Sequence, residues 1–183
     1  MKIVKKILIV VIIIIAIPLI IALFIKKEYS IQREITINKP QQEVFNYVKY
    51  LKNQDNYSKW VMTDPAMKKD FRGTDGTEGF VYAWDSKNKN AGKGEQEITK
   101  ITEGKRLDIE VRFEKPFEGI ATTPIETEAI SENQTKVKWG MNGKSKYPMN
   151  FMNLFMDNMS TGLCELGKDL EISLTNLKGI LEK

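Results

Sequence analysis

The sequence contains no histidine and a single cysteine, Cys164. An intramolecular disulfide needs two cysteines, a cysteine–histidine zinc site needs ligands that the chain lacks, and no catalytic triad with an imidazole base can form. Cys164 lies within the apolar pattern of the last predicted helix, which favours a buried, unreactive thiol over a nucleophile. Much of common enzyme chemistry is therefore excluded, and we expect neither a metal ion nor a cofactor.

Acidic residues are absent from the first 27 positions, which hold five of the 28 basic residues of the chain. The remainder of the chain is therefore close to neutral, and the net charge of +4 belongs to the N-terminal segment. A nucleic-acid-binding domain would need a basic patch on the folded domain itself. We expect no nucleic-acid partner.

Residues 7–25 form an uncharged apolar run, ILIVVIIIIAIPLIIALFI, with lysines on both sides. As a helix this run is roughly 28 Å long, close to the thickness of the hydrocarbon core of a bilayer. A cleaved signal peptide would have a shorter apolar region and would end in a small-x-small site, whereas this run ends in FIKK. We predict that residues 1–28 are an uncleaved, single-pass anchor in a bacterial cytoplasmic membrane. The flanking charges nearly balance, so the side on which the domain lies stays open.

Residues 29–183 show the pattern of one α+β domain. Residues 29–38 alternate as a strand, and Pro40 then suits the first turn of a helix over residues 41–51. A short helical or irregular piece around residues 57–61 follows. Glycines then separate short alternating segments, which predicts an antiparallel sheet. The expected strands are residues 67–72, 78–85, 95–102, 106–114, 118–130 and 135–142.

The last thirty residues carry apolar side chains at spacings of three and four, from Phe151 to Leu181. This spacing predicts one long amphipathic helix over that range. An antiparallel sheet with one face in water must cover its other face, and this helix is the only predicted element of sufficient length.

Four segments, in order, resemble the START-like (SRPBCC) superfamily in its polyketide cyclase/dehydrase and lipid-transport branch: INKPQQEVFNYV, NYSKW, GKGEQEI and KVKWGMNGKSKYPMN. The resemblance covers residue 29 to the C-terminus and implies a helix-grip fold. In that fold a curved antiparallel sheet wraps around a long C-terminal helix and encloses a cavity for a hydrophobic molecule. Members include carriers and enzymes, so the fold does not fix the function. No catalytic motif of the superfamily matches this sequence.

One face of the predicted sheet is apolar and aromatic, as the alternate positions Phe80, Tyr82 and Trp84 illustrate. Paired carboxylates, such as Glu95 with Glu97, fall mostly on the other face. Near the final helix, NFMNLFMDNM places Met152 and Met156 on the flank of the apolar stripe, where we expect the rim of the cavity. The predicted cavity-lining residues are Trp60, Phe80, Tyr82, Trp84, Trp139, Met141, Met152, Phe155, Met156 and Met159. The same side chains would also suit an ordinary core.

These patterns favour a membrane-anchored domain that binds a hydrophobic small molecule or lipid, with Tyr82, Asn142 and Asn150 as candidate polar groups. A cyclase or dehydratase is an alternative, whose base would be Tyr82, Glu95 or Asp64. A second alternative is a module that holds a protein partner in the membrane or envelope. The sequence identifies neither the ligand nor a protein partner.

Overall fold

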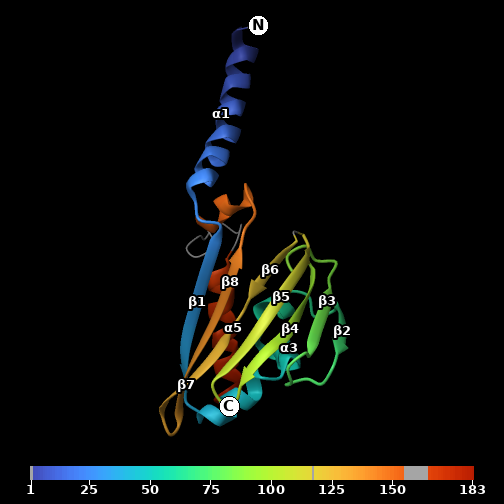
Figure 1. Ribbon diagram of the computed structural model, residues 1–183, viewed down its shortest axis with the longest axis vertical. Helices are drawn as coiled ribbons and strands as arrows, with labels where there is room; N and C mark the ends of the chain where they lie inside the picture. Colours follow the sequence, from blue (N-terminus) through green and yellow to red (C-terminus); the bar gives the residue numbers. More distant parts are fainter. Residues whose placement is uncertain (1, 117, 155–164) are drawn as a thin grey trace.

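The computed structural model describes residues 2–116, 118–154 and 165–183 (Figure 1). A long N-terminal helix leads into a mixed α+β domain in which the strands form one sheet. The elements are α1 (Lys2–Phe24), β1 (Glu28–Ile37), α2 (Gln41–Val48), the 3₁₀ helix η1 (Leu51–Asn53), α3 (Gln54–Tyr57), α4 (Lys59–Met62), β2 (Lys68–Arg72), β3 (Val81–Asp85), β4 (Lys93–Thr102), β5 (Arg106–Lys115), β6 (Gly119–Thr122), β7 (Ile125–Ser131), β8 (Gln134–Lys144), the 3₁₀ helix η2 (Met149–Leu154) and α5 (Leu166–Leu181).

The sheet is antiparallel throughout and has the strand order β1-β8-β6-β5-β4-β3-β2, with β7 paired to both β5 and β8. It curves around α5, which lies against β1 and the short helices (Figure 1). Leu170, Leu174 and Leu177 of α5 are buried against alternate residues of the strands, such as Ile109 and Val137. The predicted α+β architecture, a curved antiparallel sheet with a long C-terminal helix, is confirmed.

The predicted strand over residues 118–130 is in fact two strands, β6 and β7. Pro124 lies between them, and proline cannot donate a ladder hydrogen bond. The carbonyl of Pro124 accepts a hydrogen bond from the amide of Gly140, and the Thr123 hydroxyl donates to the carbonyl of the same glycine. The ladder is therefore interrupted at this point, while the strands on both sides of the break, β6 and β7, pair with β5 and β8.

The prediction of one helix from Phe151 to Leu181 is wrong at its start. Residues 149–154 form η2, and α5 begins at Leu166. The side chains of Asn150 and Asn153 bind carbonyl groups of the α1 segment, so a tertiary contact overrides the local helical period. Residues 155–164 lie outside the described part of the chain.

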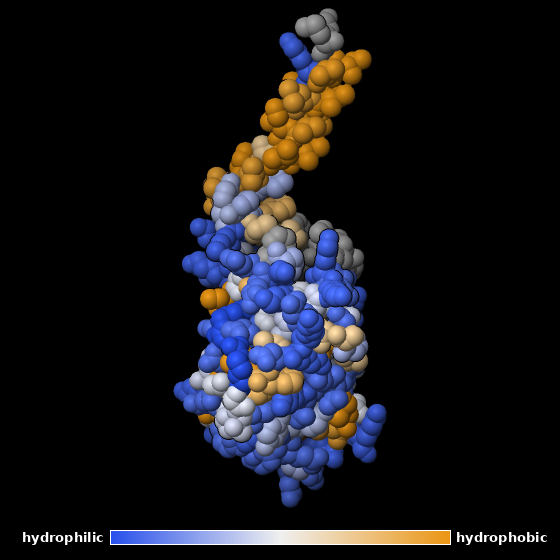
Figure 2. All heavy atoms as spheres, turned by 90° about the vertical axis from the view of Figure 1, so that its right-hand side faces the viewer, coloured by the Kyte–Doolittle hydropathy of each residue, from blue (hydrophilic) through white to orange (hydrophobic). Residues whose placement is uncertain are grey.

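Helix α1 extends away from the domain (Figure 1) and is almost uniformly apolar along its length (Figure 2). Its stretch Ile3–Phe24 is long and apolar enough to cross a membrane, and most of its side chains are exposed. Pro18 lies within the helix without ending it. The face of the domain that Figure 2 shows is mainly hydrophilic.

Candidate ligand-binding site

The inner face of the sheet, which faces α5, carries a cluster of aromatic rings from three elements. Trp139 of β8 makes edge contacts with Tyr57 of α3 and with Trp60 of α4, at centroid distances of 5.7 and 5.9 Å. Tyr57 and Trp139 are buried, whereas Trp60 is half-buried. Such edge-to-face pairs add to the stabilisation that burial of the rings provides. This cluster fixes how the short helices lie over the strands.

A second aromatic group occupies the inner face of β3. Phe80 and Tyr82 are buried, and both contact Phe71 of β2. Trp84 is half-buried and its indole N–H donates a hydrogen bond to the carbonyl of Ala91, at 2.9 Å. Its ring lies over Gly94, where a Cβ atom would come within 2.9 Å of the indole. Glycine at this position thus allows the tryptophan ring to approach β4 closely.

Two hydrogen-bonding groups on α3 are buried and have no partner among the described residues: the hydroxyl of Tyr57 and the Nε2 of Gln54. The Oε1 of Gln54 accepts a hydrogen bond from Gln96 Nε2 of β4, at 3.0 Å. Burial raises the pKa of Tyr57, so its phenol keeps its proton and remains a donor. Residues three apart on a helix share a face, so both unpartnered groups lie on the same side of α3. Buried polar groups of this kind normally bind water or a ligand.

Tyr82, a predicted polar group of the site, is already engaged. Its hydroxyl donates a hydrogen bond to Asp55 Oδ1 at 2.8 Å, and the other oxygen of Asp55 binds Lys69 at 2.7 Å. Burial, together with that hydrogen bond, raises the pKa of Tyr82. A phenol with a raised pKa is a poor general base at neutral pH.

The other two predicted polar groups also have partners elsewhere in the chain. Asn142 accepts a hydrogen bond from the hydroxyl of Ser30 across β1 and β8, at 2.6 Å. Asn150 is fully buried, but its amide donates to carbonyl groups of Ala22 and Ile25 at the end of α1. Its Oδ1 is buried and has no partner among the described residues, so that Asn150 binds a ligand stays a prediction.

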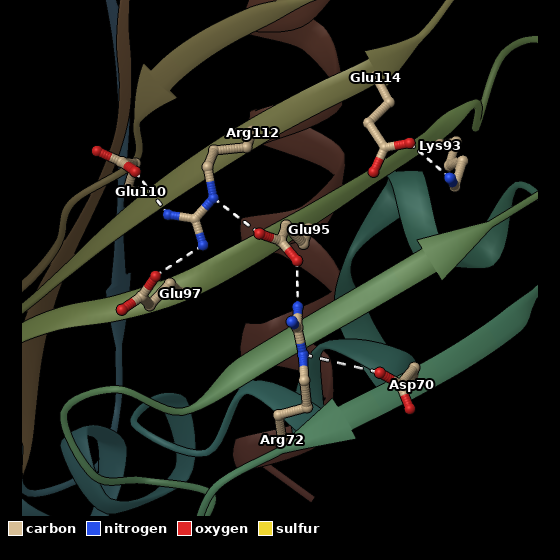
Figure 3. A network of polar contacts seen from close by, with 8 residues as sticks. All are labelled: Asp70, Arg72, Lys93, Glu95, Glu97, Glu110, Arg112 and Glu114. Carbon is tan, nitrogen blue, oxygen red and sulfur yellow. Dashed lines mark hydrogen bonds and ion pairs between the residues drawn. The ribbon is translucent and has the colours of Figure 1, made fainter.

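The outer face of the sheet carries an ion-pair network (Figure 3). The guanidinium of Arg112 binds Glu95 at 2.8 Å and both Glu97 and Glu110 at 2.6 Å, and Glu95 also pairs with Arg72. The hydrogen bond from Arg112 is the main reason why the pKa of Glu95 is lowered. A carboxylate with a lowered pKa on the outer face cannot serve as a base for a reaction in the interior. Glu95 is thus excluded as the catalytic base of the enzyme alternative.

Asp64, the remaining candidate base, lies in the turn that follows α4. It accepts hydrogen bonds from the hydroxyl of Ser86 and, at 3.2 Å, from the amide of Ala66. These bonds stabilise the turn between α4 and β2. The residue is half-buried and has a structural role in the described part of the chain.

Two of the concavities on the surface of the described residues are relevant to a ligand. The larger of the two, of about 490 Å³, lies over β5, β7 and β8 and is lined mostly by charged side chains such as Arg106, Glu126 and Lys138. The smaller, of about 270 Å³, lies between β1 and η2, beside the end of α1, and is lined in part by Ile31 and Leu154. Because Ile31 belongs to the hydrophobic core, the smaller concavity adjoins the α1 end of the apolar interior.

No protein-family model and no curated protein matches the sequence. Solved structures do match. Norcoclaurine synthase from Thalictrum flavum, also solved in complex with dopamine and hydroxybenzaldehyde, has a TM-score of 0.60 at 10% identity, over 84% of this chain and 86% of that chain. The Aha1 dimer from Colwellia psychrerythraea has a TM-score of 0.55 at 15% identity, over 84% and 96%. Ara h 8.0201 has a TM-score of 0.51 at 14% identity, over 84% and 97%.

The chain has the START-like SRPBCC fold. The sequence resemblance is thereby confirmed for the fold, and identities this low show the fold alone. In this START-like fold the described residues Phe80, Tyr82, Trp139 and Met141 are buried in the domain. Met152 is half-buried in η2, beside α1, and not in the helix that was expected to begin there.

Three predicted lining residues, Phe155, Met156 and Met159, lie outside the described residues. That the ten residues line one cavity stays a prediction. Sequence reasoning missed Gln54, Tyr57 and Gln96, which supply the polar groups of the START-like interior. A signal for Gln96 was present, because it alternates with Gly94 and Ile98 on the inner phase of its strand.

Proposed function

We propose that the protein is a membrane-anchored START-like domain that binds a hydrophobic small molecule or lipid in the interior between the sheet and α5. The observation that best supports this proposal is the pair of buried, unpartnered groups on α3, Tyr57 Oη and Gln54 Nε2, beside the ring of Trp139. Ligand pockets combine an apolar lining with a few placed polar groups. This part of the interior has that composition.

The chemistry of the interior favours a neutral ligand. Among the described residues no lysine, arginine, aspartate or glutamate is buried. A ligand carboxylate would therefore lose its hydration without gaining a cation. The phenol of Tyr57 and the amide of Gln54 instead suit an acceptor oxygen, such as that of an ester, a ketone or an alcohol. We infer a ligand with an apolar body and one uncharged oxygen.

Two further observations agree with this function. Helix α1 is long and apolar enough to hold the domain at a membrane, which concentrates hydrophobic molecules. Norcoclaurine synthase, which has the same fold, has been solved with two small aromatic molecules bound. Both observations support a hydrophobic ligand for this domain.

Heavy-atom quenching of tryptophan fluorescence tests the proposal. All three tryptophans lie outside residues 1–28. A brominated molecule that stays among the lipids around α1 therefore does not quench their fluorescence. The full chain in lipid nanodiscs would be titrated with dibromostearic acid methyl ester and with the free acid. We expect saturable quenching by the ester, reversed by unbrominated ester, and weaker quenching by the acid.

A matched pair of tyrosine variants identifies the site. Tyr57→Phe removes only the buried hydroxyl, and we expect the affinity for the ester to fall by about fivefold to tenfold, the value of one neutral hydrogen bond. Tyr47→Phe removes a hydroxyl that accepts a bond from Asn56, at 3.3 Å, and should leave the affinity unchanged. Equal affinities for both variants, or quenching that never saturates, would overturn the proposal.

A further inference from the structure

The C-terminal end of α1 is bonded to η2, from a distant part of the chain. The last carbonyl groups of any helix lack partners within the helix. Asn150 Nδ2 donates hydrogen bonds to the carbonyls of Ala22, at 2.6 Å, and Ile25, at 3.0 Å. Asn153 Nδ2 donates to those of Lys26 and Lys27, at 3.0 Å each. Two asparagines thus tie the last turn of α1 and the residues that follow it to η2.

Further bonds make this junction rigid. The hydroxyl of Ser145 donates to Asn153 Oδ1 at 2.7 Å, and the Ser145 amide donates to the carbonyl of Lys27 at 2.9 Å. The hydroxyl of Tyr147 reaches the carbonyl of Leu19 at 3.4 Å. Asn150 is fully buried. Residues 145–154 and the last turns of α1 therefore form one hydrogen-bonded unit.

The length of the apolar run fixes the depth of this unit, given that α1 spans the bilayer. The run of residues 7–25 is roughly 28 Å long against a hydrocarbon core of about 30 Å, so it has no length to spare. Leu19 precedes Ile25 by about 9 Å of helix. A hydroxyl bonded to the carbonyl of Leu19 must then lie at the level of the lipid headgroups or below them.

The composition of the unit fits that depth. Tyr147, Met149 and Leu154 are large side chains with exposed fractions of 45, 43 and 54%. Lys26 and Lys146 are exposed beside them. Tyrosine with lysine is typical of the membrane interface, and lysines near the surface attract anionic lipid.

We propose that residues 145–154 form a second membrane contact, which inserts Tyr147, Met149 and Leu154 among anionic phospholipids at the surface of the bilayer. This inference rests on the membrane anchoring in the proposed function. It also places the concavity between β1 and η2 against the lipid, since Leu154 and Asn153 line it. A hydrophobic ligand would then pass between the bilayer and the domain without crossing water.

Site-specific fluorescence quenching tests this contact on the full chain. Cys164→Ala provides a cysteine-free background, in which Met149→Cys and Leu154→Cys carry an environment-sensitive NBD label. Asn133→Cys, in the turn between β7 and β8 at the end of the domain opposite α1 (Figure 1), is the aqueous control, and Ile13→Cys in α1 is the lipid control. Nanodiscs would contain lipids with a nitroxide near the headgroup or near the bilayer centre.

We expect the headgroup nitroxide to quench the labels at 149 and 154, and we expect aqueous iodide not to quench them. The label at 133 should be quenched by iodide and not by the nitroxide. Quenching at 149 and 154 should weaken when anionic lipid is replaced by zwitterionic lipid, and equal quenching would contradict the anionic preference. If the lipid nitroxides quench the label at 13 while the labels at 149 and 154 behave like the label at 133, the second membrane contact is refuted and the membrane anchor stands. If 13 is not quenched, the anchor itself is refuted.

Discussion

Arg112→Met removes the cation that joins three carboxylates on the outer face of the sheet (Figure 3). Its three ion pairs are partly exposed, with 31% of the arginine side chain accessible, so each contributes about 0.2–1 kcal/mol. Glu97 and Glu110 face each other across β4 and β5, and without the arginine this like-charge pair is destabilising. We expect the free energy of unfolding to fall by about 1–3 kcal/mol at pH 7.

The pH dependence gives this prediction a second readout. The pKa of Glu95 is lowered in the folded state, chiefly by Arg112. A carboxylate with a lowered pKa contributes stability above its unfolded pKa, about 4.3, and loses it as the pH falls through the folded pKa. Arg112→Met removes the largest cause of this lowered pKa, so the contribution of Glu95 is lost above its unfolded pKa. The difference between the two proteins should therefore shrink as the pH falls from 7 towards 4.

The assay is urea unfolding of the full chain in detergent micelles, followed by tryptophan fluorescence at several pH values. Arg72→Met is the matched control, because in the described part of the chain Arg72 pairs with two carboxylates, those of Glu95 and Asp70, and is 56% exposed. It should lower the free energy of unfolding by less than about 1 kcal/mol. A loss in Arg112→Met no greater than in Arg72→Met, or one that does not change with pH, would refute the reasoning.

Three other substitutions test local contacts. In Gly94→Ala the new Cβ meets a β5 carbonyl at 2.5 Å and the Trp84 ring at 2.9 Å. We expect the free energy of unfolding, measured with urea, to fall by about 1–3 kcal/mol, and an unchanged unfolding midpoint would contradict this. Ser173→Ala removes the hydroxyl that accepts a 2.9 Å hydrogen bond from the amide of Lys59. The free energy of unfolding, measured by thermal unfolding, should fall by about 1–3 kcal/mol. Asn150→Ala frees two α1 carbonyls, and hydrogen exchange of residues 147–154 in nanodiscs should speed up; unchanged protection would argue against the junction.

The strands could be predicted from the sequence because sheet position is a local signal. Alternation of period two assigns each side chain to a face, and residues such as Leu107, Ile109 and Val111 are buried as the alternation requires. The separation of the outer carboxylates from the inner aromatic face follows from the same rule. The break at Pro124 also has a local cause, although the continuous apolar pattern concealed it.

The start of the final helix could not be predicted in this way. Phe151 continues a helical period, but the side chain of Asn150 bonds to Ala22, 128 residues earlier in the chain. A periodicity describes only neighbours in sequence, and it carries no information about such a partner. The partners of the candidate polar groups could not be predicted for the same reason, because Asn150 and Tyr82 bond to residues on other elements.

By itself the sequence determined the apolar N-terminal helix, the α+β class, the order of the elements and the apolar inner face, all of which depend on composition and period. Only the tertiary structure decided which polar groups remain unpartnered. Tyr57 and Gln54 became candidates because folding buried them and provided no partner for two of their atoms among the described residues. Hydrogen-bond satisfaction depends on every neighbour in space, and it is defined only after the chain has folded.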